Sequence, residues 1–479
     1  MIAHELTPAP DPVRCCEQLS GLPYRVFLDS AQHGSSLGRY SFVAADPAAV
    51  VRRRGEDAAD ALDDIRRLLT PRATQPLAGV PPFQTGALGY IAYEWGRTLE
   101  RIPAPRFDDL GLPDVVFGIY DWTIAWDHET ARAWVIARDE ANKRRALDLL
   151  GDPDRLRQGS GESRRSGAEA ERAAPEHRHG PVGVRESTER PPSYPVDADW
   201  IDPRLELRSS FTHTGYLDAV NRVRDYIYAG DIFQANLSQR FEAALVESPW
   251  DLYRRLRTRN AAPFAAFIEL PECAVLSASP ERFMRMDAAG HVETRPIKGT
   301  RPRGVGPEHD AALGRALTES AKDRAENLMI VDLIRNDLSR VCEPGSVRVR
   351  ELFALEHFAT VHHLVSTVVG TLSPGLDGLD LLRASFPGGS ITGAPKIRAM
   401  EIIAELEPSV RGVYCGAIGY LSVTGELDTN IAIRTALATD GRVYLNAGGG
   451  IVADSDAEQE YQETFHKARG IIDALVTST

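Results

Sequence analysis

The chain has 479 residues, of which 43% are hydrophobic and 26% are charged, and its formal net charge is -13 at pH 7. These values are typical of a soluble globular protein with two to four domains or one large core, and the acidic charge argues against a nucleic-acid binder. The N-terminus has no apolar signal segment, no run reaches the ~20 apolar residues of a membrane span, and the five cysteines contain no CxxC pair, so we expect a cytoplasmic protein without a membrane segment or zinc site.

Short strands separated by turn residues are predicted in the first 150 residues. The expected strands cover residues 24–30, 39–46, 48–55, 86–95, 115–127 and 131–139. Between the third and fourth strands, Ala58, Leu62, Ile65 and Leu69 have the spacing of one helix face. The short connections indicate antiparallel pairing and not βαβ units.

A change in composition follows at residue 151. Residues 151–199 are rich in Gly, Ser, Arg, Glu and Pro and have almost no aliphatic side chains, so they bury too little surface to offset the entropy of ordering. We predict a flexible linker over residues 151–203, between an N-terminal half (1–150) and a C-terminal half (204–479). Such a linker does not require the two halves to fold separately.

Helix and strand patterns alternate in the C-terminal half. The expected helices cover residues 214–229, 320–339, 377–385, 395–407 and 456–476. The expected strands cover residues 231–241, 263–268, 274–279, 282–286, 413–423, 426–439 and 442–452, with the hairpin dipeptide Asp440-Gly441 between the last two. Groups of mostly antiparallel strands followed by helices predict an α+β fold.

Residues 295–304, Arg-Pro-Ile-Lys-Gly-Thr-Arg-Pro-Arg-Gly, place four cations, two prolines and two glycines around Lys298. Proline restricts the backbone, and glycine lets it approach a ligand closely. In a cleft, this peptide would offer donors to an anion and a nitrogen able to act as a nucleophile. The alternative is a solvated basic loop, because long cationic side chains are mostly exposed.

Two expected helices each carry a pair of carboxylates three residues apart, Asp323 with Glu326 and Glu460 with Glu463. Residues at i and i+3 share a helix face. Two such helices that face one cavity would bind a hard divalent cation through oxygen, as Mg²⁺ prefers. The alternative is a pair of solvated acidic faces.

Two glycine-rich segments precede helices. Residues 386–396 (FPGGSITGAPK) have the composition of an anion site at a helix N-terminus. Residues 446–453 (NAGGGIVA) match GxGxxA only superficially, because no later strand can complete a dinucleotide-binding βαβ unit. Backbone N–H groups that grip a carboxylate, or a tight turn alone, are the two interpretations of the second segment.

Taken together and in order, these segments resemble the chorismate-utilising enzymes, which include anthranilate synthase component I, aminodeoxychorismate synthase component I, and isochorismate and salicylate synthases. The matching segments are FLDS (27–30), GALGYIAYE (86–94), GDIFQANLSQRF (230–241), SPERF (279–283), PIKGTRPRG (296–304), AENLMIVDLIRND (325–337), HHLVS (362–366), FPGGSITGAPK (386–396), GAIGY (416–420), LDTNIAIRTA (427–436), AGGGIVADS (447–455) and EYQETFHKA (460–468). The resemblance implies one large αββα sandwich with strands from both halves, and a cleft for chorismate and Mg²⁺ in the C-terminal half.

The resemblance also implies roles for individual residues. The metal glutamates fall on Glu326 and Glu463, with Asp323 and Glu460 as second carboxylates, and the general acid for the departing 4-hydroxyl falls on Glu281. The implied substrate contacts are Gln234, Gly299, Thr300, His363, Thr392, Tyr414, Arg434, Gly448, Gly449, Gly450 and Lys467. A tryptophan site of some relatives falls on Ser30, Pro263, Phe264 and Ala265.

Two positions distinguish members of the family. Water-using members carry a lysine base where Gln234 stands, and a neutral amide cannot deprotonate water, so we expect ammonia or an amine as the nucleophile. Anthranilate synthases have a PIAGT-like stretch, whereas this chain has PIKGT with Lys298. The resemblance then implies that neutral Lys298 attacks C2 while the 4-hydroxyl leaves with a proton from Glu281, and that ammonia adds at C4 to give 4-amino-4-deoxychorismate for 4-aminobenzoate and folate biosynthesis.

No cysteine lies in an amidotransferase-like context, so we expect ammonia from a separate glutamine amidotransferase subunit. We expect Arg295, Arg301, Arg303 and Mg²⁺ to lower the pKa of Lys298, as neighbouring positive charges do.

Two alternative functions remain at this point. The first is anthranilate synthase component I, which releases pyruvate. The second is a non-catalytic regulatory subunit, against which the intact set of Glu281, Glu326, Glu463 and Arg434 argues.

Overall fold

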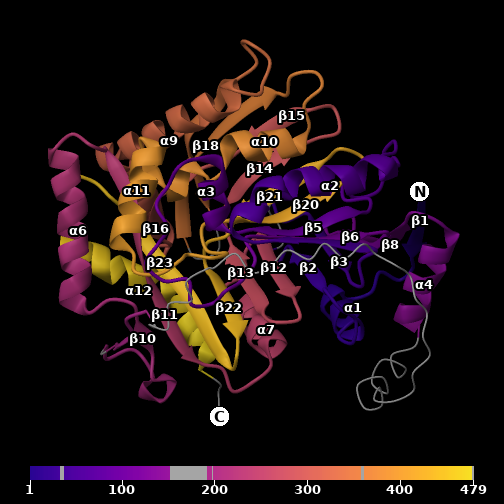
Figure 1. Ribbon diagram of the computed structural model, residues 1–479, viewed down its shortest axis with the longest axis horizontal. Coiled ribbons are helices and arrows are strands. Elements are labelled where there is room, and N and C mark those ends of the chain that lie inside the picture. Colours follow the sequence, from indigo (N-terminus) through magenta and orange to yellow (C-terminus); the bar gives the residue numbers. More distant parts are fainter. Residues whose placement is uncertain (33–36, 152–190, 197, 358–360, 477–479) are drawn as a thin grey trace.

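The computed structural model describes residues 1–32, 37–151, 191–196, 198–357 and 361–476 (Figure 1). Most of the predicted linker, residues 152–190 and 197, lies outside the described residues. Near the end of the predicted linker, Tyr194 and Pro195 form a short strand that pairs with Ser209 and Arg208. The chain is therefore part of the fold before residue 204.

The N-terminal half supplies eight strands and four α-helices to the described structure, together with three short 3₁₀ turns. In chain order these elements are β1 (Ile2–Leu6), α1 (Pro12–Gln18), β2 (Val26–Asp29), β3 (Tyr40–Ala44), β4 (Ala49–Arg53), η1 (Gly55–Asp60), α2 (Ala61–Leu69), η2 (Thr70–Arg72), β5 (Gly86–Ile91), η3 (Tyr93–Trp95), α3 (Gly96–Leu99), β6 (Val115–Tyr120), β7 (Trp122–Asp127), β8 (Arg132–Ala137) and α4 (Glu140–Gly151).

The rest of the described chain supplies the remaining strands and most of the helices around the site. In chain order these are β9 (Tyr194–Pro195), η4 (Pro203–Leu205), β10 (Arg208–Ser209), α6 (His213–Tyr228), β11 (Gln234–Ala244), α7 (Pro249–Arg259), β12 (Phe264–Glu269), β13 (Ala274–Ser279), β14 (Arg282–Met286), β15 (His291–Thr294), β16 (Ile297–Pro302), α8 (Pro307–Glu319), α9 (Ala321–Ser339), β17 (Arg348–His357), β18 (Val361–Thr371), α10 (Gly378–Ser385), η5 (Gly389–Ile391), β19 (Gly393–Ala394), α11 (Lys396–Leu406), β20 (Ala417–Ser422), β21 (Leu427–Ile431), β22 (Thr435–Thr439), β23 (Arg442–Ile451) and α12 (Ala457–Leu475).

The strands form two large sheets, and both halves contribute to each. The 13-stranded sheet has the order β1-β8-β7-β3-β2-β12-β13-β22-β23-β11-β10-β9, with β19 beside β11, and the 10-stranded sheet has the order β16-β18-β15-β14-β21-β20-β5-β6-β4, with β17 beside β18. The halves join where β2 pairs with β12 and where β5 pairs with β20. Every pairing between the named strands described is antiparallel, which confirms the predicted pairing.

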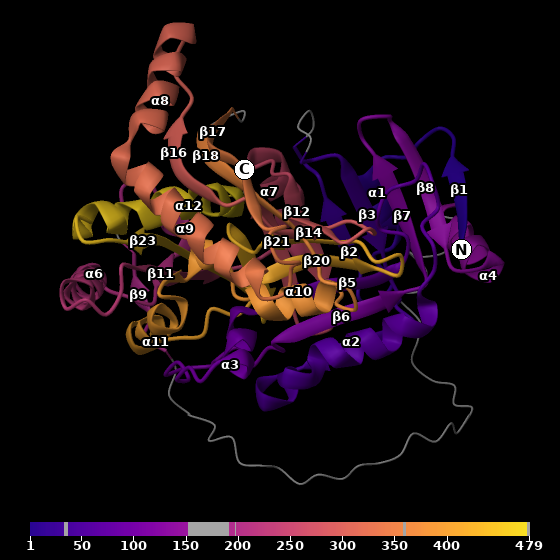
Figure 2. The ribbon, with the colours of Figure 1, turned by 90° about the horizontal axis from the view of Figure 1, so that it is seen from above.

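Three hydrophobic layers hold the sheets and helices together. One lies between the sheets and contains Phe42, Tyr90 and Val275, from strands of both halves. A second lies between the 13-stranded sheet and helices such as α12 and α7, and a third lies between the 10-stranded sheet and helices such as α2, α9 and α10 (Figures 1 and 2). Burial of this apolar surface is the main stabilising term. The predicted αββα sandwich, an α+β fold with both halves in one body, is confirmed.

Two predicted strands are wrong in one respect, because each is divided between the two sheets. The expected strand 115–127 breaks at Asp121 into β6 of the smaller sheet and β7 of the larger sheet, and the expected strand 426–439 breaks after Ile431 into β21 and β22. Most residues in these strands are buried on both faces, so the pattern along the sequence gives no sign of the crossing. The Asp440-Gly441 hairpin is confirmed, since Thr439 pairs with Arg442 across it.

Residues 295–304 are only partly a loop. Ile297–Pro302 form strand β16, which pairs with β18 at the edge of the smaller sheet. The next helix, α8, projects from the rest of the molecule beside this edge (Figure 2). The sequence patterns did not predict α7, α8, β17 or β18.

Candidate active site

Strand β16 has a bulge at Lys298 and Gly299. Ile297 pairs with Val365, but the next paired residue is Thr300, opposite His363, so the register shifts at Lys298 and Gly299. Gly299 has φ +83°, and a Cβ there would lie 3.0 Å from Cγ of Asp323. Glycine is therefore required for the conformation and for the close approach of helix α9. The Lys298 Nζ donates a hydrogen bond to the Ser390 carbonyl at 3.2 Å.

The pKa of Lys298 is lowered from its ordinary value, mainly because burial disfavours the ammonium form. The ammonium of Lys467 lowers it further, while the carboxylate of Glu326 opposes the shift. The expected direction is right, but the expected contribution of the three arginines is wrong, while that of Mg²⁺ stays a prediction. The three arginines of the segment are paired with carboxylates of their own: Arg295 with Glu356, Arg301 with Asp323 and Arg303 with Asp310.

Glu281 lies between β13 and β14 and is only 5% exposed. Burial raises the pKa of its carboxyl group to about 7, although a hydrogen bond with the Ser390 side chain and the positive charge of Lys298 oppose this rise. Ser390 therefore contacts both groups, Lys298 through its carbonyl and Glu281 through its side chain. A carboxyl with a pKa near 7 can donate a proton at neutral pH.

Two further side chains line the site beside Lys298 and Glu281: the neutral imidazole of His363 and the guanidinium of Arg434. Burial lowers the pKa of His363 to about 4, and the charge of Arg434 adds to the shift, so the imidazole is neutral at pH 7. Its Nδ1 lies 2.9 Å from the hydroxyl of Thr300. Arg434 sits at the break between β21 and β22 with φ +48°. Among the described residues it forms no ion pair, and a cation largely shielded from solvent in this state is suited to an anionic ligand.

Helices α9 and α12 bring the two predicted carboxylate pairs to the same site, where the charges of Glu326 and Glu463 act on each other. Burial raises the pKa of Glu326 and of Glu460. The pKa of Glu463 is lowered, chiefly by Lys467, whose Nζ lies 2.6 Å from Oε1. A Cβ on Gly449 would lie 2.9 Å from Oε2 of Glu460, so strand β23 passes directly against these carboxylates.

The carboxylates fit a magnesium site in which water and substrate supply the remaining ligands. Within the described parts of the chain, no group of three or more His, Cys, Asp or Glu side chains is arranged to hold a metal by itself. Glu326 and Glu463 would supply two carboxylates, and Mg²⁺ commonly takes one or two from the protein and the rest from water and substrate. Asp323 is held by Arg301 at 2.9 Å and Glu460 by Ser455 at 2.7 Å, so neither is free to turn.

Gln234 and Thr392 lie where β11 meets the loop before α11. The Oε1 of Gln234 is buried and has no hydrogen-bond partner among the described residues. A Cβ on Gly450 would lie 2.0 Å from Nε2 of Gln234, so glycine makes room for the amide. The hydroxyl of Thr392 donates to the Gly388 carbonyl at 3.0 Å, and it therefore shapes the loop.

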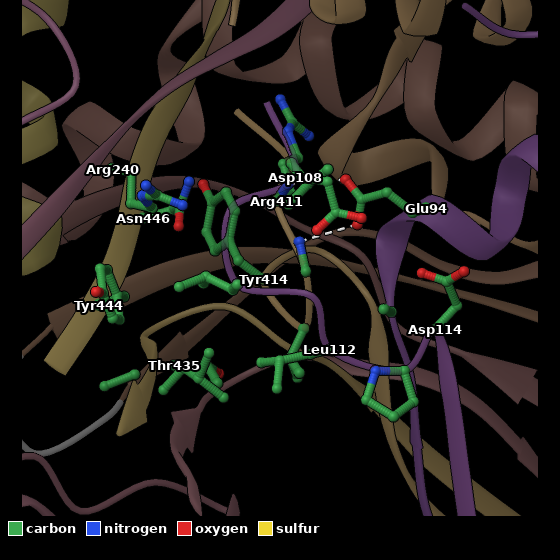
Figure 3. A pocket seen from close by; sticks show the side chains of 18 residues that line it. Glu94, Asp108, Leu112, Asp114, Arg240, Arg411, Tyr414, Thr435, Tyr444 and Asn446 are labelled. Carbon is green, nitrogen blue, oxygen red and sulfur yellow. Dashed lines mark hydrogen bonds between the residues drawn. The ribbon is translucent and has the colours of Figure 1, made fainter. Parts of the chain in front are cut away.

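Behind the site, Tyr414 forms one wall of a small pocket of about 40 Å³ (Figure 3). Arg411 lies over the Tyr414 ring at 5.8 Å and donates to the carbonyl of Ile391 at 3.1 Å, beside Ser390. Glu94 of the N-terminal half accepts from the backbone N–H of Arg411 at 2.7 Å. The N-terminal half thus supports, through Arg411, the segment that carries Ile391 and Ser390.

Sequence reasoning did not select Ser390 or Arg411 as site residues. Glu94 was named only as part of the GALGYIAYE segment and was given no role. Ser390 lies within the 386–396 motif, and that position was the one available signal for it.

The four residues of the expected tryptophan site lie together. A cavity of about 190 Å³ between the halves, here called the inter-half cavity, is lined by Ser30 and by residues 263–265. The Ser30 hydroxyl donates to the Tyr40 carbonyl at 2.6 Å, and the Asn430 amide donates to the Phe264 carbonyl at 3.0 Å. Charged residues of this cavity include Arg39, Arg282 and Asp428.

This fold and site define a chorismate enzyme. The model of the chorismate binding enzyme family matches residues 24–473, and the chain belongs to this family. In the part of the chain that the structure describes, no helix is long and apolar enough to cross a membrane.

Similarity to individual proteins places the chain more narrowly within the family. The chain is 40% identical over 471 residues to aminodeoxychorismate synthase component 1 of Escherichia coli (strain K12), covering 96% of this chain and 94% of the relative. It is 43% identical over 470 residues to aminodeoxychorismate synthase component 1 of Klebsiella aerogenes, covering 95% of each. The crystal structure of anthranilate synthase component I from Streptococcus pneumoniae matches with a TM-score of 0.71 at 34% identity, covering 92% of this chain and 94% of that one.

Proposed function

We propose that the chain converts chorismate and ammonia to 4-amino-4-deoxychorismate, as its relatives named aminodeoxychorismate synthase component 1 do. The observation that carries this proposal is the pairing of Lys298 with Glu281 at Ser390. Burial lowers the pKa of the amine and raises the pKa of the acid to about 7. Both shifts favour the forms that the reaction requires, the neutral amine as nucleophile and the protonated acid for the departing hydroxyl group.

The reaction then has two substitution steps. The Nζ of Lys298 forms a bond to C2 of chorismate, the ring double bond shifts, and the C4–O bond breaks as Glu281 gives its proton to the leaving hydroxyl, which departs as water. Ammonia next forms a bond to C4, the double bond shifts back, and the C2–N bond to Lys298 breaks. The proton that the new ammonium group loses returns to Glu281. The sum is chorismate plus ammonia giving 4-amino-4-deoxychorismate plus water.

The remaining residues hold the substrate. Arg434 supplies a cation, largely shielded from solvent, for a carboxylate, and the backbone of Gly448, Gly449 and Gly450 would hold another. Thr300, with its hydroxyl oriented by neutral His363, supplies a hydrogen bond. We propose Mg²⁺ as the cofactor, held by Glu326 and Glu463; when bound, it neutralises the ring carboxylate of chorismate.

Gln234 supports ammonia as the nucleophile in preference to water. Its buried Oε1 lacks a partner and is suited to accept an N–H of ammonia. An amide has no basicity with which to deprotonate water. We propose that the ammonia comes from a partner glutamine amidotransferase, and the component 1 in the relatives' names supports a second component.

We also propose that the inter-half cavity binds tryptophan. Its mixture of apolar and polar lining residues, with the ion pair of Arg282 and Asp428, suits an aromatic zwitterion. None of the residues that line the cavity is among those proposed for catalysis.

Anthranilate synthase component I remains the second candidate, because the matching crystal structure from Streptococcus pneumoniae is that of an anthranilate synthase component I. One assay separates the candidates: the purified chain is given chorismate, Mg²⁺ and an ammonium salt, and the product is tested with a lyase that makes 4-aminobenzoate. Our proposal predicts 4-aminobenzoate only when the lyase is present. Fluorescent anthranilate would support the second candidate, and no chorismate consumption would indicate a regulatory subunit.

A further inference from the structure

We propose that Lys467 is a stand-in for the metal on Glu463. In the metal-free chain its ammonium group neutralises the Glu463 carboxylate, and metal binding transfers that ammonium group to the carboxylate of the substrate. This inference rests on the proposed function, which places Mg²⁺ on Glu326 and Glu463.

The contacts of the four carboxylates single out this lysine. Asp323 is paired with Arg301, and Glu460 accepts from Ser455. Glu463 is the one of the four described carboxylates whose partner is a lysine, at 2.6 Å from Oε1, and the two residues lie one helical turn apart on α12. Both side chains are nearly half exposed, at 43% for Lys467 and 47% for Glu463. The ammonium group therefore has room to move.

A second contact determines where the ammonium group goes. The Nζ of Lys467 also donates to the Gly448 carbonyl at 2.8 Å. Gly448 begins the glycine run of β23 whose backbone would hold a carboxylate of the substrate. When Glu463 is taken by a metal ion, Lys467 can keep this contact and turn its remaining N–H groups to that anion, because a lysine presents three donors on a flexible stem.

The exchange makes metal and substrate depend on each other. An ammonium group and a divalent cation repel at one carboxylate oxygen, so Lys467 competes with Mg²⁺ while the substrate is absent. When the substrate is present, the displaced ammonium group gains a carboxylate in place of Glu463. Each ligand should therefore tighten binding of the other by the same factor.

The test is calorimetric titration of Mg²⁺ into the full chain without substrate. Because the ion pair is partly exposed, we expect Lys467→Met to bind Mg²⁺ about two- to fivefold more tightly than the natural chain. The matched control is Lys322→Met, which removes an equal charge that acts on Glu463 but forms no ion pair with it. We expect the control to change the affinity by less than about twofold, since screened charges at longer range act weakly.

The outcomes separate the exchange from the metal site on which it rests. If neither the natural chain nor Lys467→Met binds Mg²⁺, the metal assignment fails and the exchange fails with it. If the natural chain binds Mg²⁺ and Lys467→Met binds it no more tightly, or no more tightly than Lys322→Met does, the exchange alone is overturned.

A second titration includes chorismate and omits ammonia, so that the reaction stops at the Lys298 adduct and no 4-amino-4-deoxychorismate forms. We expect chorismate to tighten Mg²⁺ binding in the natural chain and to do so several-fold less in Lys467→Met, which should also have a higher KM for chorismate. Tighter metal binding together with weaker substrate binding is not expected of a merely structural residue. Lys467→Gln, which keeps a hydrogen-bond donor, repeats the test if the methionine variant does not fold, and equal weakening of both ligands in these variants would overturn the proposal.

Discussion

The candidate active site and the inter-half cavity differ in how their charged groups are compensated. In the active site Glu281 and Glu326 have raised pKa values, Lys298 has a lowered one, and Arg434, largely shielded from solvent, has no carboxylate paired with it among the described residues. In the inter-half cavity several of the charged groups, though not Arg285, are paired with neighbours of opposite charge among the described residues. Arg39 is paired with Asp127 and Arg282 with Asp428, at 2.8 Å and 3.0 Å.

This difference indicates what each region can do. Shifted pKa values gathered in a cleft are the mark of a reaction site, because the groups are held away from their ordinary protonation states. Charges that are already paired are not held away from their ordinary protonation states, and they suit the recognition of a ligand without reaction. We therefore expect changes in the active site to alter rates, and changes in the inter-half cavity to alter stability and ligand binding.

The largest effect should come from Lys298→Ala. Without the nucleophile the covalent route is lost, and we expect 4-amino-4-deoxychorismate formation to fall by about 10³-fold or more, with any remaining turnover shifted towards anthranilate. The measurement is the lyase-coupled assay with fluorescence detection of anthranilate. Lys322→Ala, on helix α9, which packs against β16, is the control for loss of a nearby charge that takes no part in the proposed reaction. A natural rate of product formation in Lys298→Ala would show that the lysine is only a cation in the wall.

Glu281→Gln should lower kcat/KM by about 10²- to 10⁴-fold, the usual range for a general acid. In the natural chain the proton-donating form of Glu281 is present below its pKa of about 7 and is lost as the pH rises through that value, so kcat/KM should fall on the alkaline side. The variant should lack this alkaline fall. A pH profile that is the same in both proteins would exclude Glu281 as the acid.

Glu326→Gln tests the metal. Loss of a hydrogen-bonded outer partner commonly costs 10- to 100-fold in metal affinity, so loss of a direct ligand should weaken Mg²⁺ binding by about 100-fold. Chelation of Mg²⁺ should likewise stop turnover until Mg²⁺ is restored. The variant Asp332→Asn, on the same helix but at its exposed face, is the control. Equal Mg²⁺ affinity in the natural chain and Glu326→Gln would contradict the assignment.

In the inter-half cavity, Asp428→Asn should act on stability. It leaves the buried guanidinium of Arg282 with weaker compensation, and we expect the free energy of unfolding to fall by about 2 kcal/mol. Because this pair takes no part in the reaction, kcat of the folded variant should stay within about twofold. Denaturant unfolding measures the first quantity, with Glu5→Gln as control, since its ion pair with Arg132 is half-exposed and should contribute about 0–1 kcal/mol. A large fall in kcat would break the distinction between the two regions.

The smallest effect concerns tryptophan. If it binds in the inter-half cavity, it should raise Tm in proportion to the logarithm of its concentration, because only the folded chain binds it. Ser30→Ala removes the hydroxyl that donates to the Tyr40 carbonyl and should reduce this rise. Tm measured with and without tryptophan is the test, and an unchanged Tm in the natural chain would exclude the site.

More of the fold and of the site could be predicted than hydrophobic periodicity alone allows, because the ordered set of motifs supplies further information. The αββα architecture and the grouping of strands from both halves were predicted in this way, as was the Asp440-Gly441 hairpin from its turn chemistry. The crossing of β6–β7 and β21–β22 between sheets was not, since strands buried on both faces carry the same apolar pattern in either sheet.

The chemistry of the site was predictable by residue type but not by cause. The lowered pKa of Lys298 was expected from neighbouring arginines, yet each arginine is paired with its own carboxylate, and burial causes the shift. Burial depends on packing by distant segments, which a local pattern does not record. The supporting contacts of Ser390 and Arg411 were missed for the same reason, because they arise from a loop, a helix end and the N-terminal half.

The most direct test of the central claim is intact-protein and peptide mass spectrometry after the chain is mixed with chorismate and Mg²⁺ without ammonia. The account predicts a covalent adduct with the mass of chorismate less one water, located on the peptide that contains Lys298 and absent from Lys298→Ala. A chain that forms no such adduct, yet makes 4-amino-4-deoxychorismate when ammonia is added, would contradict it.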